Sequence, residues 1–218
     1  MNAFEANSGE LPTVKASPTK GSSLPEKQGL YDPAKEHDSC GVGFVVNVKG
    51  VKSHSIVEQG LQILANLEHR GAVGADELAG DGSGILIQIP DEFFQAETSK
   101  LGFGLPQAGQ YGIGMIFMPQ DDAIRRRCEK YVERFVEAEG QKVLGWREVP
   151  VNGAGLGLTV KASEPKVRQI FVGIGEHIAD QEAFERKLFV IRKQISNGNR
   201  ASKLDPGDHF FIPSLSSR

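Results

Sequence analysis

A cysteine stands where a polar leader gives way to a small, apolar run. Cys40 follows a charged segment that stops at Ser39, and it precedes Gly41 and an apolar run over 42–48. If the leader is cleaved after Ser39, Cys40 becomes an N-terminal residue with a thiol and a free α-amine. An α-amine titrates close to neutral pH, so it can take the proton of its own thiol. One residue would then supply both the nucleophile and the base for attack on an amide.

A structural role is the alternative interpretation of both cysteines. Unpaired cysteines are among the most buried residue types, so a small side chain opening a core strand needs no chemistry to explain it. Cys128 favours that role, because it lies on the apolar stripe of an expected helix over 121–138. Two cysteines so far apart do not indicate a secreted disulfide framework. We expect Cys128 to pack in the core, and both interpretations stay open for Cys40.

An arginine and a glycine form the second candidate feature. Arg70 and Gly71 end an expected helix that begins near Ser55 and follows the apolar run 42–48. A strand followed by a returning helix would bring Arg70 back beside the start of the strand. There its guanidinium could hold the backbone carbonyl of Cys40 and orient the amine. Gly71 permits a close backbone approach that a side chain would block.

Other kinds of site lack the residues that they need. The five histidines have no metal-ligand spacing to one another or to a cysteine, so no metal site is expected. The glycines of 80–84 lead into the strand-like run 85–89, whereas a nucleotide-binding loop opens a helix. With a net charge of −3, the three arginines of 125–127 read as the solvated face of a helix. Nucleic acid is therefore not an expected partner.

Hydrophobic periodicity predicts an α+β chain with several strands and amphipathic helices. Helices are expected from about 55, over 121–138 and from 180. Strands are expected over 42–48, 85–89, 111–118, 142–149 and 167–173, with a last one beginning at 209–212.

The first 39 residues are expected to be a disordered leader, or propeptide, before a folded domain over 40–218. They are rich in Ser, Pro, Lys, Gly and Glu, and bury too little apolar surface to fold. They lack the apolar centre of a signal peptide and the arginine-rich character of a transit peptide. No apolar run approaches the length of a membrane span. The expected location is the cytoplasm, with no membrane partner.

Seven segments together resemble one family. They are 40–44, 68–76, 80–90, 143–151, 163–165, 185–192 and 214–218. Their combination is similar to the class-II glutamine amidotransferase domain of the glutamate synthase large subunit, from about residue 29 to the end of the chain. The residues after the His-Arg-Gly of 69–71 separate this family from other class-II amidotransferases.

The resemblance implies a fold and an enzymatic activity. The fold is that of an N-terminal-nucleophile hydrolase, a four-layer αββα sandwich of two antiparallel sheets between helices. Cys40 would attack the side-chain amide of glutamine and release ammonia, with Arg70 and Gly71 helping to form the site. A synthase domain outside this chain would use the ammonia to aminate 2-oxoglutarate, as an oxidoreductase of nitrogen assimilation. That domain would hold FMN and an iron–sulfur cluster, and no cofactor is expected in this chain.

The resemblance also places part of the site beyond Arg218. An Asn-Gly pair for the oxyanion and the residues that bind the glutamine α-carboxylate are expected there, so the fold would be incomplete at its C-terminus. We expect the isolated chain to hydrolyse glutamine poorly. The expected partners are the remainder of the large subunit and an electron-donating small subunit or ferredoxin. Two alternatives stay open, namely an inactive or partner-binding fragment and an N-terminal-cysteine hydrolase of another amide.

Overall fold

The computed structural model describes residues 26–30, 32, 34, 40–68, 71, 80, 82–202 and 204–218. The chain divides into two compact units, Met1–Ala72 and Val73–Arg218, and each is described by itself. Most of the predicted leader lies outside the described residues, so its assignment as a propeptide stays a prediction.

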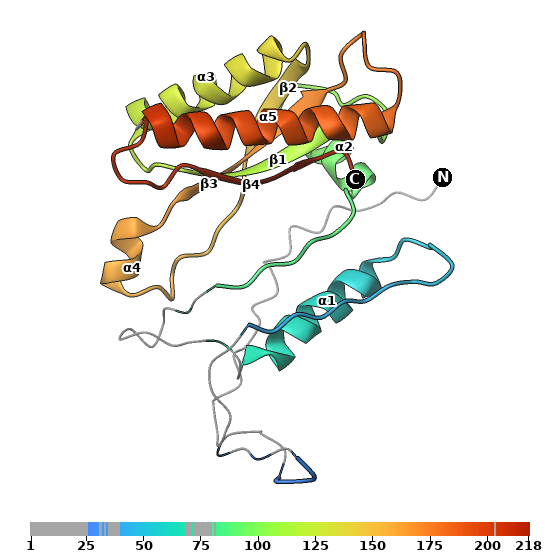
Figure 1. The fold of residues 1–218 in the computed structure, drawn as a ribbon, viewed down its shortest axis with the longest axis vertical. Coiled ribbons are helices and arrows are strands. Elements are labelled where there is room, and N and C mark those ends of the chain that lie inside the picture. Colours follow the sequence, from blue (N-terminus) through green and yellow to red (C-terminus); the bar gives the residue numbers. More distant parts are fainter. Residues whose placement is uncertain are drawn as a thin grey trace. The chain divides into compact units, whose positions relative to one another are not determined.

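The first unit is a helix with an extended segment beside it. Helix α1 spans His54–Asn66, as the sequence predicts, and the segment from Cys40 approaches it through a turn (Figure 1). The backbone carbonyl of Asn47 accepts from the Gly50 N–H at 2.9 Å, and the Asn47 side-chain oxygen Oδ1 accepts from the Lys49 N–H. Gly50 has φ +68°, a conformation that glycine adopts without strain. The turn therefore folds the segment back along α1.

The second unit is built on one four-stranded antiparallel sheet. The strand order is β2-β3-β1-β4, and every neighbouring pair runs antiparallel. The strands are β1 (Tyr111–Met118), β2 (Lys142–Glu148), β3 (Lys166–Gly173) and β4 (Phe211–Ser216). The expected strands over 111–118, 142–149 and 167–173 and the last one from 209–212 are confirmed, to within a residue or two.

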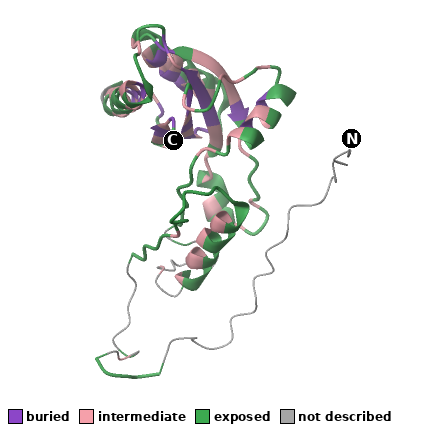
Figure 2. Ribbon diagram, turned by 90° about the vertical axis from the view of Figure 1, so that its right-hand side faces the viewer, coloured by how far each residue is buried: buried purple, intermediate pink, exposed green. Residues whose placement is uncertain are grey.

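Two long amphipathic helices cover one face of this sheet. They are α3 (Asp122–Ala138) and α5 (Gln181–Ser202), and their apolar stripes pack on alternate residues of β1 and β3 (Figure 1). Most of the buried apolar residues gather between these helices and the sheet, whereas α1 has no buried residue (Figure 2). Asp121 caps α3 by accepting from the N–H groups of Ala123 and Ile124 at 2.9 and 2.8 Å. This layer is the hydrophobic core of the chain.

The opposite face of the sheet carries helix α2 (Asp91–Lys100). This helix places Phe94 edge-to-face against Phe171 of β3, with ring centroids 5.5 Å apart. The Tyr111 hydroxyl donates to the Asp91 carboxylate at 2.8 Å, which fixes the start of α2 on β1. A short helix, α4 (Leu158–Ser163), interrupts the loop between β2 and β3, and the sequence did not indicate it.

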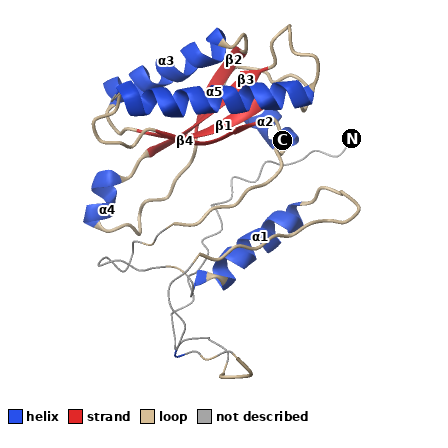
Figure 3. Cartoon of the chain, viewed as in Figure 1, coloured by secondary structure: helices blue, strands red, loops and turns tan. Residues whose placement is uncertain are grey.

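Two predicted strands are wrong in this structure. Residues 42–48 and 85–89 lie outside the strands and helices, and are drawn as loops in Figure 3. They have no neighbouring strand among the described residues, and most of their apolar side chains are exposed, with Phe44 87% and Leu86 93% exposed, although Ile89 packs against the cluster around Phe94. A strand needs a ladder partner, which an apolar pattern alone cannot supply. The α+β class is confirmed, while the described residues hold one sheet of the two that were expected.

Candidate active site

Cys40 is exposed, at the start of the extended segment that runs beside α1. Successive side chains of an extended chain point to opposite sides, and in this segment one side carries apolar residues and the other carries glycines. Val42, Phe44, Val46 and Val48 face outward and are exposed. Gly41 and Gly43 face the helix. The thiol is thus accessible, and the glycines lie where the chain meets α1.

Each of the two glycines packs on one apolar side chain at the end of the helix. A Cβ atom on Gly41 would lie 2.9 Å from Cδ2 of Leu67, and one on Gly43 would lie 2.6 Å from Cγ2 of Ile63. Two residues of extended chain advance roughly 6.6 Å, and four residues of helix advance about 6 Å. The spacing from Gly41 to Gly43 therefore matches the spacing from Leu67 back to Ile63. The segment and α1 are therefore antiparallel, and Cys40 lies toward the C-terminal end of α1.

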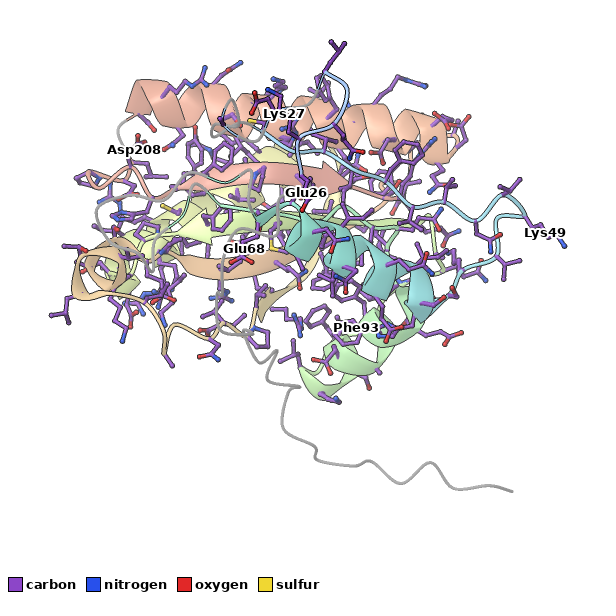
Figure 4. All side chains as sticks on the ribbon, turned by 90° about the horizontal axis from the view of Figure 1, so that it is seen from below. Glu26, Lys27, Lys49, Glu68, Phe93 and Asp208 are labelled. Atoms are coloured by element: carbon purple, nitrogen blue, oxygen red, sulfur yellow. The ribbon has the colours of Figure 1, made fainter. Side chains whose placement is uncertain are left out.

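The chain beyond α1 carries the other two predicted site residues. Glu68 marks this end of the helix in Figure 4, and Lys49 marks the turn beyond the other end. Gly71 is half-buried, and its N–H donates to the Glu68 carbonyl at 3.1 Å. Arg70 lies outside the described residues, so its role stays a prediction. The packing of Leu67 on Gly41 brings the start of the extended segment close to this end of α1.

Cys128 is a structural cysteine, as expected. Its side chain is fully buried on α3, in the core between the helices and the sheet. Burial raises the pKa of the Cys128 thiol to about 12, and the nearby Asp205 carboxylate adds to the rise. Burial and the raised pKa both disfavour a thiolate at Cys128, which favours a packing role for it over that of a nucleophile.

The described part of the chain holds neither a cluster of metal ligands nor a helix suited to span a membrane. In those residues, no group of three or more His, Cys, Asp or Glu side chains could hold a metal ion. None of the described helices combines the length and the apolar character that a membrane crossing requires.

Sequence reasoning missed the contribution of Ile63 and Leu67. Both lie on the apolar face of a predicted helix, where they read as ordinary core residues. A signal was present, because Gly41 and Gly43 are two apart and Ile63 and Leu67 four apart. Small and large residues in matching periods indicate a close approach of segment and helix.

Residues 40–218 match the family of class-II glutamine amidotransferases. The match covers most of the chain, and the chain therefore belongs to this family. It begins at Cys40, the exposed cysteine described above.

Curated relatives narrow the resemblance to glutamate synthases, as the motifs predicted. The glutamate synthase (NADPH) large chain of Bacillus subtilis is 46% identical over 195 residues, which are 89% of this chain and 12% of that protein. The corresponding chain of Azospirillum brasilense is 34% identical over 216 residues, 99% of this chain and 13% of that protein. Ferredoxin-dependent glutamate synthase 2 of Synechocystis is 39% identical over 184 residues, 84% and 11% respectively. The chain thus spans about a tenth of the length of these relatives.

Proposed function

We propose that this chain supplies the nucleophile, Cys40, for the glutaminase half-reaction of a glutamate synthase, and that the remainder of the large subunit completes the site. One observation supports this most strongly: the family match begins at Cys40, and this cysteine is exposed. The alternative thiol, Cys128, is buried and has a raised pKa. The exposure of Cys40 also disfavours the interpretation of that residue as a core cysteine.

The proposed reaction begins with cleavage of the peptide bond between Ser39 and Cys40. The freed α-amine accepts the thiol proton, and Sγ attacks the amide carbon of the glutamine side chain. The carbon–nitrogen bond breaks, the proton passes to the leaving nitrogen, and ammonia departs. A γ-glutamyl thioester remains on Sγ. Water hydrolyses this thioester, which releases glutamate and restores the thiol.

Arg70 and Gly71 are proposed to form the site around this residue. The packing of Gly41 on Leu67 supports their placement, because Leu67 is the C-cap residue of α1 and Arg70 follows shortly after it. In this role the Arg70 guanidinium holds the Cys40 carbonyl and so orients the amine toward the thiol. The backbone of Gly71 lets the chain approach closely.

A second sheet is also proposed, which would complete the four-layer fold. The outward row of Val42, Phe44, Val46 and Val48 supports it. An apolar row of this kind on an extended segment is what a sheet buries against its neighbours.

The wider protein is proposed to use the ammonia for glutamate synthesis in the cytoplasm. The names of the relatives, which are an NADPH and a ferredoxin-dependent glutamate synthase, support the glutamate synthesis. The FMN and the iron–sulfur cluster are assigned to that wider protein. Such a cluster typically takes about four cysteine thiolates, and this chain has two cysteines, one of them buried. No step of the proposed glutaminase reaction passes through either group.

A pair of cysteine variants tests the proposal, in the protein expressed from its whole coding sequence. Cys40→Ala should abolish glutamine hydrolysis, because it removes the nucleophile. Cys128→Ala is the matched control and should leave turnover nearly intact. Glutaminase activity that survives in Cys40→Ala, or is lost only in Cys128→Ala, would refute the assignment.

A further inference from the structure

We infer that Ile63 and Leu67 are positioning residues, which fix through Gly43 and Gly41 where the Cys40 thiol lies. The inference rests on the proposed function in one respect, that Cys40 is the nucleophile. Two contacts, Gly43 with Ile63 and Gly41 with Leu67, set the register between α1 and the extended segment that begins at Cys40.

The contact between Gly43 and Ile63 is the more rigid of the two. A methyl group on Gly43 would meet Cγ2 of Ile63 at 2.6 Å, a distance that requires one of the two to move. Isoleucine in a helix has one strongly preferred χ1 rotamer, so Cγ2 cannot swing aside. Any side chain at position 43 must therefore push the segment away from α1 or along it.

The contact between Gly41 and Leu67 is softer and closer to the thiol. A Cβ atom on Gly41 would meet Cδ2 and Cδ1 of Leu67 at 2.9 and 3.1 Å. These are the ends of a flexible side chain, which can rotate. Leu67 is nevertheless the residue against which the neighbour of Cys40 packs. The two contacts together place Cys40 at one position along the helix.

Nothing else among the described residues fixes this register through backbone ladders. The segment has no neighbouring strand, and its outward side chains are exposed. Its turn at 47–50 closes on itself through Asn47. Among the described residues of this unit, contact with α1 is what places Cys40.

The test is a set of four variants in the whole protein. Gly43→Ala introduces the clash. Gly43→Ala/Ile63→Ala removes the Cγ2 atom and relieves it. Gly43→Ala/Ile63→Val keeps both γ-branches and therefore keeps the clash. Ile63→Ala alone is the reference for the lost packing. Gly104→Ala controls for an added methyl group, because a Cβ atom there meets nothing within 4 Å.

The first readout is the position of Cys40, and it does not depend on activity. With any other exposed cysteines of the whole protein replaced by serine, a nitroxide attached to Cys40 should broaden the methyl resonances of Leu67, while the buried Cys128 stays unlabelled. Broadening should weaken in Gly43→Ala and in Gly43→Ala/Ile63→Val, and return in Gly43→Ala/Ile63→Ala. The same broadening in all four variants would overturn the inference.

The second readout is the kcat for glutamine hydrolysis. Misplacement of a nucleophile by about 1 Å can cost up to roughly 100-fold, so we expect Gly43→Ala to lose at least about tenfold. Gly43→Ala/Ile63→Ala should return to within about threefold of Ile63→Ala, whereas the Ile63→Val double variant should not recover. Equal loss in the two double variants would overturn the inference. If the nitroxide pattern follows expectation but wild-type protein hydrolyses no glutamine, the register stands and the proposed function fails.

Discussion

Nζ of Lys187 lies 2.7 Å from Oε2 of Glu139, which ties α5 to the C-terminal end of α3. The other carboxylate oxygen accepts from Nε2 of Gln194 at 2.6 Å, also on α5. The Lys187 ammonium, followed by the Gln194 amide, holds the pKa of Glu139 below its ordinary value. Only about a fifth of the Glu139 side chain is exposed, so water screens the pair less than at an open surface.

Glu139→Gln should lower the free energy of unfolding of the second unit by about 1 kcal/mol at pH 7, because it removes a charge-assisted contact between the helices. Urea unfolding followed by the fluorescence of Trp146 measures this. Trp146 is the single tryptophan, and its Nε1–H donates to Glu133 of α3 at 2.8 Å. Glu137→Gln, on the exposed side of the same helix, is the control and should have little effect.

The effect of Glu139→Gln should depend on pH. Because the pKa is lower in the folded state, the stabilisation is complete above the ordinary glutamate pKa of about 4.3 and is lost as pH falls through the lowered value. The difference between wild type and variant should therefore shrink below about pH 4. A difference that stays constant or grows in acid would contradict the charge assignment.

Asp121 should contribute to stability as the cap of α3. Asp121→Ala leaves the N–H groups of Ala123 and Ile124 without their acceptor and should cost about 1 kcal/mol. Asp121→Asn preserves an acceptor and should cost much less. Asp122→Ala removes only an exposed ion pair with Arg125, so its cost should also be small. Equal losses in all three variants, measured by urea unfolding, would show that the cap is not the cause.

Gly112 of β1 should tolerate no side chain. A Cβ atom there would lie 2.5 Å from Cδ1 of Leu188 and 3.0 Å from the Ser216 carbonyl oxygen, which belongs to the backbone of β4. Gly112→Ala should thus cost about 1–3 kcal/mol through overpacking. The matched control is Gly104→Ala, where the new methyl group meets open space. Thermal unfolding of the two variants side by side checks this, and an unchanged Tm for Gly112→Ala would refute it.

The sequence predicts the strands of the sheet and the two long helices because their apolar periodicity and capping residues lie within each segment. The apolar stripe of 121–138 is buried on one face of α3, and Asp121 caps it as a helix-starting residue should. The run 42–48 has an equally clear apolar pattern, yet forms no strand, because a strand also needs a partner at the right distance. No local pattern can state where that partner lies.

The candidate site divides in the same way. Cys40 could be proposed from the sequence as a candidate nucleophile, because a leader, a thiol and an apolar run adjoin there. The residues of α1 that pack against its segment could not be assigned from the sequence, because the contact of Gly43 with Ile63 depends on how an extended segment crosses a helix. Glycines two residues apart and apolar residues four apart fit several ways of packing the segment on the helix, and only the three-dimensional structure distinguishes them.

The two thiols should differ sharply in reactivity. In the native protein a thiol reagent should modify Cys40, which is exposed, and spare Cys128, which is buried and whose pKa is raised to about 12. Within residues 1–218, counting the modified thiols by mass spectrometry should give one before denaturation and two after it. Cys128→Ala should keep the fast reaction and lower stability by about 1 kcal/mol through a small cavity. Rapid native modification of Cys128 would contradict its placement in the core.

The most direct test of the account is to trap the covalent intermediate. Active protein is mixed with glutamine, quenched in acid and digested, and the peptides are analysed by mass spectrometry. We predict a γ-glutamyl adduct on a peptide that begins at Cys40, because the amine freed by cleavage after Ser39 is the proposed base. An adduct on another residue, or turnover by protein that still carries Ser39, would contradict the account.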